Sequence, residues 1–170
     1  RSLRIVQASM GRGSAKVTAA VEAVVPSGMD VRDPQAMGDF IRRTLGEHRI
    51  RLRKAIVDVP RQDVVFNRLS LPGGSTDELA AMVHIQIAKE LPFSKEQAVI
   101  DFAVVPREGS GTLDVWVAAI RNPVLAYYKQ VAEAAGLSLE RVGLRPYANV
   151  RALSALEAGP GRQGAHVGVG

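Results

Sequence analysis

Hydrophobic and polar positions alternate along the first 25 residues in two runs that are typical of β-strands. The runs cover residues 3–8 and 16–25, and the glycine-containing segment 11–14 between them favours a hairpin. Asp33-Pro34 then supplies a helix N-cap and a first-turn proline. Apolar residues follow at helical spacing, which predicts a helix over 34–47.

Two further strands are predicted before the second helix. Residues 55–59 form a mostly apolar run that ends at Pro60, which is typical of a buried strand. Residues 63–71 alternate in polarity toward Pro72. The chain up to this point therefore reads as two strands, a helix and two strands.

The second helix carries the strongest local signals in the sequence. Ser75 stands three residues before Glu78, the spacing of a capping box, and Leu91-Pro92 ends the helix. Helical spacing places several residues on one face: Leu79, Met82, Val83, Gln86 and Glu90. Strands at 98–105 and 113–120 follow, joined by the glycine-containing segment 108–111.

A third helix begins at Asn122-Pro123 and ends at Gly136, which is placed as a left-handed cap. The pattern then predicts a strand over 139–144 and a short helix over 147–156. Residues 158–164 have the composition of a linker, and residues 165–170 look like a strand at its beginning. This alternation of strands and helices indicates an α/β (α+β) fold.

Composition narrows the class of protein. With 46% hydrophobic residues the chain can bury a sizeable core. The sequence contains no uninterrupted run of about 18 apolar residues, the length that a membrane-spanning helix needs, so we expect a soluble chain. The first residues lack the apolar stretch of a secretory signal. The absence of cysteine excludes disulfides, thiolate zinc sites and cysteine nucleophiles, and it favours a cytoplasmic setting.

The formal net charge of +5 is concentrated in one region of the chain. Its basic residues are Arg42, Arg43, Arg49, Arg51, Arg53, Lys54, Arg61 and Arg68. Such a cluster suits phosphates or an anionic membrane surface, although Glu47, Asp58 and Asp63 interrupt it. Because only 5% of the residues are aromatic, stacking surface for bases is scarce, and we do not expect DNA or RNA binding.

Motifs for catalysis or metal binding are weak. The histidines lie far apart in the sequence, without a partner at ligand spacing, so no metal site is predicted: His48, His84 and His166. Acid–base chemistry by a carboxylate pair would require a proximity that the sequence does not show for Asp58, Asp63 or Asp101. No catalytic residue is predicted.

Several short motifs in a fixed order carry a resemblance to a known family. They are Leu71-Pro72, Glu78-Leu79, Leu91-Pro92-Phe93, Asp101-Phe102, Ala118-Ala119 with Arg121, and the segments 134–137 and 147–152. In this order and spacing, positions 55–155 resemble the type IV pilus assembly PilM family, which belongs to the actin-like ATPases and is related to the GspL and FtsA families. The sequence departs from the family pattern at two places. Gln86 stands where the family often has a glutamate, and Asn67-Arg68 is out of register with the family's arginine before the Leu-Pro strand end.

The resemblance implies part of an actin-like (ribonuclease H-like) lobe with an inserted strand-helix-strand-strand subdomain. It divides the chain into 1–63 and 122–164 as the lobe, 64–121 as the insertion, and 165–170 as a truncated second lobe. Gly168 and Gly170 would open the second phosphate turn. The whole protein would bind ATP and magnesium, whereas this stretch, with an incomplete site, would bind neither and have no activity.

The resemblance also implies a cytoplasmic adaptor that reaches the inner membrane indirectly, through a partner of the PilN type. The partner's N-terminal tail would lie in a groove beside the insertion, and the groove residues expected from the sequence are Arg68, Leu71, Met82, Val83 and Gln86. Alternatives are a GspL-like secretion protein, an FtsA-like division protein, an actin-like ATP hydrolase and a basic nucleic-acid module. The resemblance also allows self-association of this chain, because the inserted subdomain takes part in head-to-tail association in other actin-like proteins.

Overall fold

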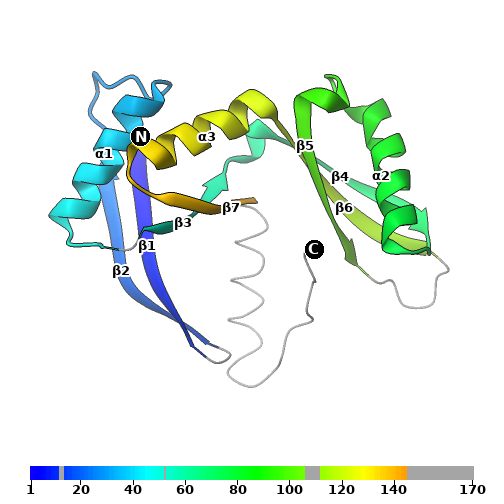
Figure 1. Ribbon diagram of the computed structural model, residues 1–170, viewed down its shortest axis with the longest axis horizontal. Helices are drawn as coiled ribbons and strands as arrows, with labels where there is room; N and C mark the ends of the chain where they lie inside the picture. The colour runs from blue at the N-terminus through cyan, green and yellow to red at the C-terminus, as the bar shows by residue number, and fades with distance from the viewer. Residues whose placement is uncertain (12–13, 52, 106–111, 145–170) are drawn as a thin grey trace. The chain divides into compact units, whose positions relative to one another are not determined.

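The structure is a computed structural model that describes residues 1–11, 14–51, 53–105 and 112–144, shown as ribbons in Figure 1. The chain divides into two compact units. Of the described residues, unit 1 comprises Arg1–Val57 and Ala126–Val142, and unit 2 comprises Asp58–Leu125 together with Gly143 and Leu144. The predicted insertion, 64–121, lies within unit 2, and its limits stay a prediction.

The positions of the elements follow the sequence pattern closely. In chain order they are β1 (Ser2–Gly11), β2 (Ser14–Val24), α1 (Pro34–Glu47), β3 (Lys54–Val59), η1 (Arg61–Asp63), β4 (Val64–Pro72), α2 (Thr76–Glu90), η2 (Lys95–Gln97), β5 (Ala98–Val105), β6 (Thr112–Arg121), α3 (Asn122–Ala134) and β7 (Ser138–Leu144). The predicted helix at 147–156 and the segment at 165–170 lie outside the described residues. No helix in the described part of the chain is long and apolar enough to cross a membrane.

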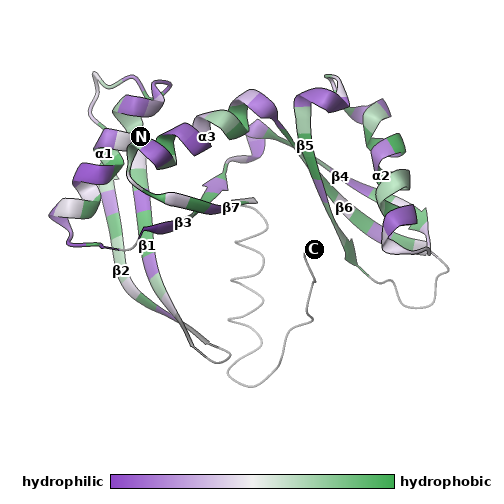
Figure 2. Ribbon diagram, in the orientation of Figure 1, coloured by the Kyte–Doolittle hydropathy of each residue, from purple (hydrophilic) through white to green (hydrophobic). Residues whose placement is uncertain are grey.

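In unit 1, strands β1 and β2 form the predicted antiparallel hairpin, with Ser2 opposite Val24. Figure 2 shows hydrophobic and hydrophilic residues alternating along β1, as expected of strands with two different faces. Leu3 and Ile5 point to the partly buried face, whereas Val6 lies on the exposed one. The register shifts between Gln7 and Ala8.

Helices α1 and α3 pack against each other at small residues. A side chain at Gly38 would bring its Cβ within 2.4 Å of the Ala134 Cβ, so the two helices approach closely at this point. Arg42 donates from Nη1 to the Ala134 carbonyl, 3.3 Å away. At the other end of the helix pair, the Tyr127 hydroxyl donates to the Val31 carbonyl at 2.5 Å.

The predicted end of α3 at Gly136 is confirmed. Gly136 has φ +72°, and the amide of Leu137 donates to the Ala132 carbonyl at 2.8 Å, which closes the helix with a left-handed turn. The chain then enters β7, which pairs with β3 in a two-stranded sheet. The expectation that β3 is buried is wrong for most of the strand: only Val59 is buried, and Ile56 is 67% exposed. Its residues alternate in burial because one face alone is covered.

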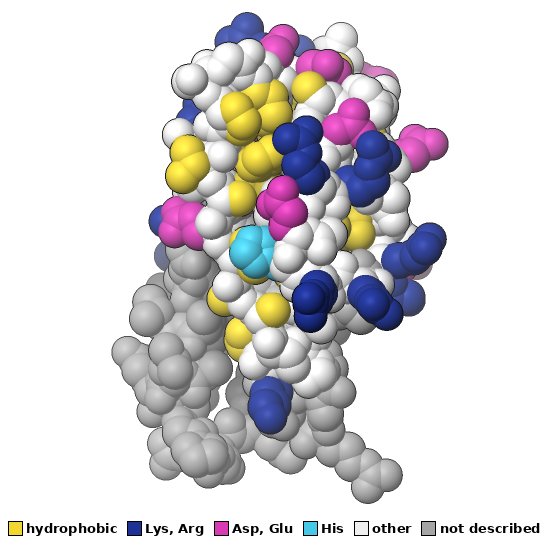
Figure 3. All heavy atoms as spheres, turned by 90° about the vertical axis from the view of Figure 1, so that its left-hand side faces the viewer, with side chains coloured by type: hydrophobic (Ala, Val, Ile, Leu, Met, Phe, Trp, Pro, Cys, Tyr) yellow, Lys and Arg dark blue, Asp and Glu magenta, His cyan; other side chains and the backbone are white. Residues whose placement is uncertain are grey.

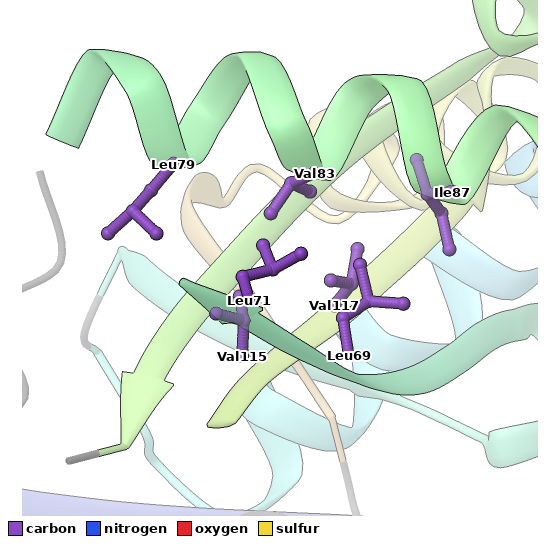
Figure 4. Packing of buried hydrophobic residues seen from close by; sticks show 7 residues of the cluster. All are labelled: Leu69, Leu71, Leu79, Val83, Ile87, Val115 and Val117. Atoms are coloured by element: carbon purple, nitrogen blue, oxygen red, sulfur yellow. The ribbon is translucent and has the colours of Figure 1, made fainter. Parts of the chain in front are cut away.

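Unit 2 is a three-stranded antiparallel sheet, in the order β4–β6–β5, with α2 packed on one face. Leu69 pairs with Val115, and Val117 with Phe102, so that each strand sends every second side chain toward the helix. Figure 4 shows the buried side chains of α2 and the sheet pointing toward one another. The cluster consists of Leu69, Leu71, Leu79, Val83, Ile87, Val115 and Val117.

Helix α2 begins with the predicted capping box. The Ser75 side chain accepts from the Glu78 amide at 3.3 Å, and the Glu78 carboxylate accepts from the Ser75 amide at 2.8 Å. The buried stripe of the helix consists of Leu79, Val83 and Ile87, at intervals of four residues. The predicted face was partly wrong, since Gln86 and Glu90 are exposed.

Replacing Ser75 by alanine should lower the free energy of unfolding by about 1 kcal/mol, because an amide in the first turn of α2 loses its acceptor.

The hydrogen bond from the Ser75 amide lowers the pKa of Glu78 below its ordinary value of 4.5. This stabilisation is complete above pH 4.5 and is lost as the pH falls through the lowered pKa. Melting curves between about pH 3 and 7 check both the cost of Ser75→Ala and this loss, with Glu78→Gln as the variant that should lose less stability at acid pH than the unchanged chain, because Glu22 and Glu96, whose pKa values are lowered too, remain.

Candidate partner-binding surface

The face of the unit 2 sheet opposite α2 carries the most distinctive exposed side chains of the unit. Because side chains alternate along a strand, the neighbours of the core residues point to this second face. We call it the Trp116 face, after the residue at its centre. It consists of Phe66, Arg68 and Ser70 from β4, Asp114, Trp116 and Ala118 from β6, and Val99, Asp101, Ala103 and Val105 from β5.

Two aromatic rings stack on the Trp116 face. The centroids of Phe66 and Trp116 lie 5.2 Å apart with an angle of 18° between the ring planes. Trp116 is 37% exposed, and Val99 and Val105 on the neighbouring strand are exposed as well. Tryptophan is highly buried on average in folded proteins, so the exposure of Trp116 beside other apolar side chains makes this face a candidate contact surface.

An ion pair lies beside the aromatic stack. Arg68 Nη2 lies 2.6 Å from Asp114 Oδ2, and the hydrogen bond between them raises the pKa of the Arg68 guanidinium. The same guanidinium lies 5.8 Å from the centre of the Trp116 ring, within the range of a cation–π contact. Asp114 therefore holds the arginine in a defined position next to the ring.

The chemistry of this face suits recognition more than catalysis. It offers apolar surface, one positioned cation and the exposed carboxylate of Asp101. Strands β4 and β5 form the edges of the sheet, and edge strands supply backbone groups that an extended peptide can pair with. Among the described residues, no group of three His, Cys, Asp or Glu side chains is placed to hold a metal ion.

The residues predicted from the sequence for the partner groove do not all come together. Arg68 is exposed on the Trp116 face, while Leu71 and Val83 are buried in the core between α2 and the sheet. Met82 is partly buried against that core, and Gln86 is exposed on α2. Arg68 and Leu71 are three positions apart on one strand, so their side chains point to opposite faces of the sheet. The five residues therefore do not line one groove.

Sequence reasoning missed the aromatic pair of Phe66 and Trp116. The signal was present in β6, where Trp116 stands between Val115 and Val117 in an alternating strand. If the valines face the core, the tryptophan must face the other side. An aromatic residue at the outward position of such a strand indicates an exposed surface or a second covering layer.

The predicted nucleotide residues, Gly168 and Gly170, lie outside the described residues. Binding of ATP and magnesium by the whole protein therefore stays a prediction.

Three comparisons with known proteins bear on this arrangement. The family described as type IV pilus assembly protein PilM matches residues 1–165. A chain of a solved structure described as a PilM-PilN type IV pilus biogenesis complex is 24% identical, with a TM-score of 0.78. The cytoplasmic domain of EpsL, an inner membrane component of the type II secretion system of Vibrio cholerae, is 16% identical, with a TM-score of 0.52.

These two structural matches cover most of this chain but only part of the other proteins. The first covers 89% of this chain and 47% of the other, and the second 84% and 52%, so the chain spans about half the length of each. At these identities the matches show the fold. The predicted partial actin-like α/β lobe is thus confirmed by its likeness to the chain from the PilM-PilN complex.

Proposed function

The chain belongs to the type IV pilus assembly protein PilM family, and from this premise we propose that it is a cytoplasmic adaptor in pilus assembly. It docks the N-terminal tail of an inner-membrane partner of the PilN type, and the tail binds on the Trp116 face of unit 2. The likeness to a chain from a PilM-PilN complex supports the choice of partner, and the EpsL match extends the proposed role to related secretion systems.

The observation that carries this proposal is the exposed stack of Phe66 and Trp116. A large, rigid aromatic surface binds peptide side chains with little loss of conformational freedom, and such residues dominate the binding energy at many interfaces. The Arg68–Asp114 pair beside the stack provides both a donor and an acceptor. Together these features suit an extended tail with apolar side chains at alternate positions.

Titration of the chain with a synthetic peptide of the partner's tail tests the docking. The chain contains a single tryptophan, so its intrinsic tryptophan fluorescence reports on position 116 alone. We expect heat of binding in calorimetry together with a blue shift of the Trp116 emission, because the peptide removes the indole from water. A peptide of the same composition in scrambled order serves as the control.

Replacing Trp116 by alanine should weaken peptide binding at least tenfold, since truncating a central aromatic anchor commonly costs about 2 kcal/mol or more and about 1.4 kcal/mol corresponds to a factor of ten. The matched control is Ile85→Ala, which removes an apolar side chain that is 62% exposed on α2 of the same unit. Calorimetry with the tail peptide measures both variants. If Trp116→Ala and the unchanged chain bind the peptide with equal affinity, the docking site does not lie on the Trp116 face. If neither the unchanged chain nor any variant binds the peptide, the proposed docking function is contradicted.

A further inference from the structure

Positive charge is concentrated at the end of α1 and in the loop after it. Residues 39–54 contain six basic and two acidic residues, whereas residues 58–125 contain six basic and nine acidic residues, so unit 2 does not share this charge. We call the basic residues of the segment the α1 basic cluster: Arg42, Arg43, Arg49, Arg51, Arg53 and Lys54.

Backbone hydrogen bonds keep the start of this loop beside the last turn of the helix. The amide of Arg49 donates to the Gly46 carbonyl at 3.1 Å, and the amide of Ile50 donates to the Leu45 carbonyl at 2.9 Å. Arg49 adopts φ 55°, which turns the chain back at this point. Figure 3 shows Lys and Arg side chains gathered on the lower part of the face that it presents, where no Asp or Glu side chain separates them.

Most of the cluster is exposed and available to a partner. Within the described residues, Arg43, Arg49 and Arg51 form no ion pair, and all three are exposed. Arg42 pairs with Asp39 at 2.5 Å, and Lys54 pairs with Glu140 at 3.4 Å. Unpaired arginines at this density repel one another, so an external anionic surface is the expected complement.

We propose that the α1 basic cluster contacts the anionic phospholipid headgroups of a membrane surface. Arginine binds phosphate through several donors at once, and a juxtaposed set of basic side chains is attracted to an anionic leaflet. The described part of the cluster segment has one aromatic residue, Phe40, and it is buried, so no stacking platform for nucleic-acid bases accompanies the charge. The choice of a membrane over a nucleic acid rests on the proposed docking of an inner-membrane partner.

Sedimentation with lipid vesicles tests this contact without the partner. The 170-residue chain should bind vesicles of phosphatidylcholine with about 30% phosphatidylglycerol at low salt, release them as the salt concentration rises, and ignore pure phosphatidylcholine. The double variant Arg43→Gln/Arg51→Gln should reduce the partition coefficient about thirtyfold, since each basic residue near such a surface contributes about fivefold. The matched control, Lys89→Gln/Lys95→Gln, removes the same charge from exposed positions of unit 2 and should change binding less than about twofold.

Three results would overturn the proposal. They are the absence of binding to anionic vesicles at low salt, an equal loss in the two double variants, and tighter binding to a random DNA duplex than to the vesicles. Melting curves of both double variants should match the unchanged chain, because all four replaced side chains are exposed and form no ion pair within the described residues. The vesicle assay contains no tail peptide. A negative result in it would therefore overturn the membrane contact without contradicting the proposed docking on the Trp116 face.

Discussion

Replacing Ile87 by alanine is expected to lower the free energy of unfolding by about 3 kcal/mol. Ile87 is fully buried, and it packs from α2 onto Leu69 and Val117 of the sheet (Figure 4). Its truncation removes apolar contact area and leaves a cavity that the rigid sheet fills poorly, and the cost of this change for an isoleucine is about 2–5 kcal/mol. Urea denaturation followed by circular dichroism measures it.

The same helix offers the matched control for Ile87→Ala. Ile85 is the same residue type two positions away and is 62% exposed, so Ile85→Ala should change the free energy of unfolding by less than about 0.5 kcal/mol. The contrast isolates burial from helix propensity, because both variants make the same change within one helix. Similar losses for the two variants would contradict the assignment of Leu79, Val83 and Ile87 as the buried stripe of α2.

Replacing Gly38 by alanine should destabilise unit 1 by about 2 kcal/mol, although alanine is the better helix former. The new methyl group would lie 2.4 Å from the Ala134 Cβ and 2.9 Å from the Val131 carbonyl oxygen. Neither atom belongs to a flexible side-chain end, so α1 and α3 would have to move apart. Thermal unfolding, followed by circular dichroism, measures the loss.

Gly46 on the same helix predicts the opposite sign. A Cβ at Gly46 would meet nothing within 4 Å, so Gly46→Ala should stabilise the chain by about 0.5–1 kcal/mol through the lower entropy of the unfolded state. A stabilising effect of Gly38→Ala would show that the helices of unit 1 are not in close contact at this residue. The pair of variants thus separates helix propensity from packing.

The elements of the fold were predictable where the signal is local. The N-cap at Asp33, the capping box of Ser75 and Glu78, and the left-handed Gly136 each act through the backbone within a few residues. These features fix where helices begin and end regardless of tertiary contacts. The predicted helix over 34–47 and the predicted start and end of α2 were therefore correct.

The faces of the elements were harder to predict because burial depends on what packs against them. The apolar run of β3 indicated burial on both sides, but within the described residues one face of the strand is covered and Ile56 lies 67% exposed on the other. The residues predicted for the groove are separated for a similar reason, since Arg68 lies on the Trp116 face of the sheet, whereas Val83 packs from α2 onto the opposite face. The pairing of β4 with β6 brings Phe66 next to Trp116. Because the two strands are about 50 residues apart in the sequence, no local sequence pattern indicates this pairing.

The pairing of β3 with β7 has a consequence for the order in which the chain is synthesised. All three strands of the unit 2 sheet, together with α2, have been made once residue 121 has been added. Strand β3 comes before that sheet in the sequence, yet its partner β7 begins only at Ser138. Within the described part of the chain β7 is the strand that pairs with β3, so on the ribosome β3 waits for this partner while the whole of the later sheet is made. Such an unpaired strand edge is open to wrong pairing with other chains until its partner arrives.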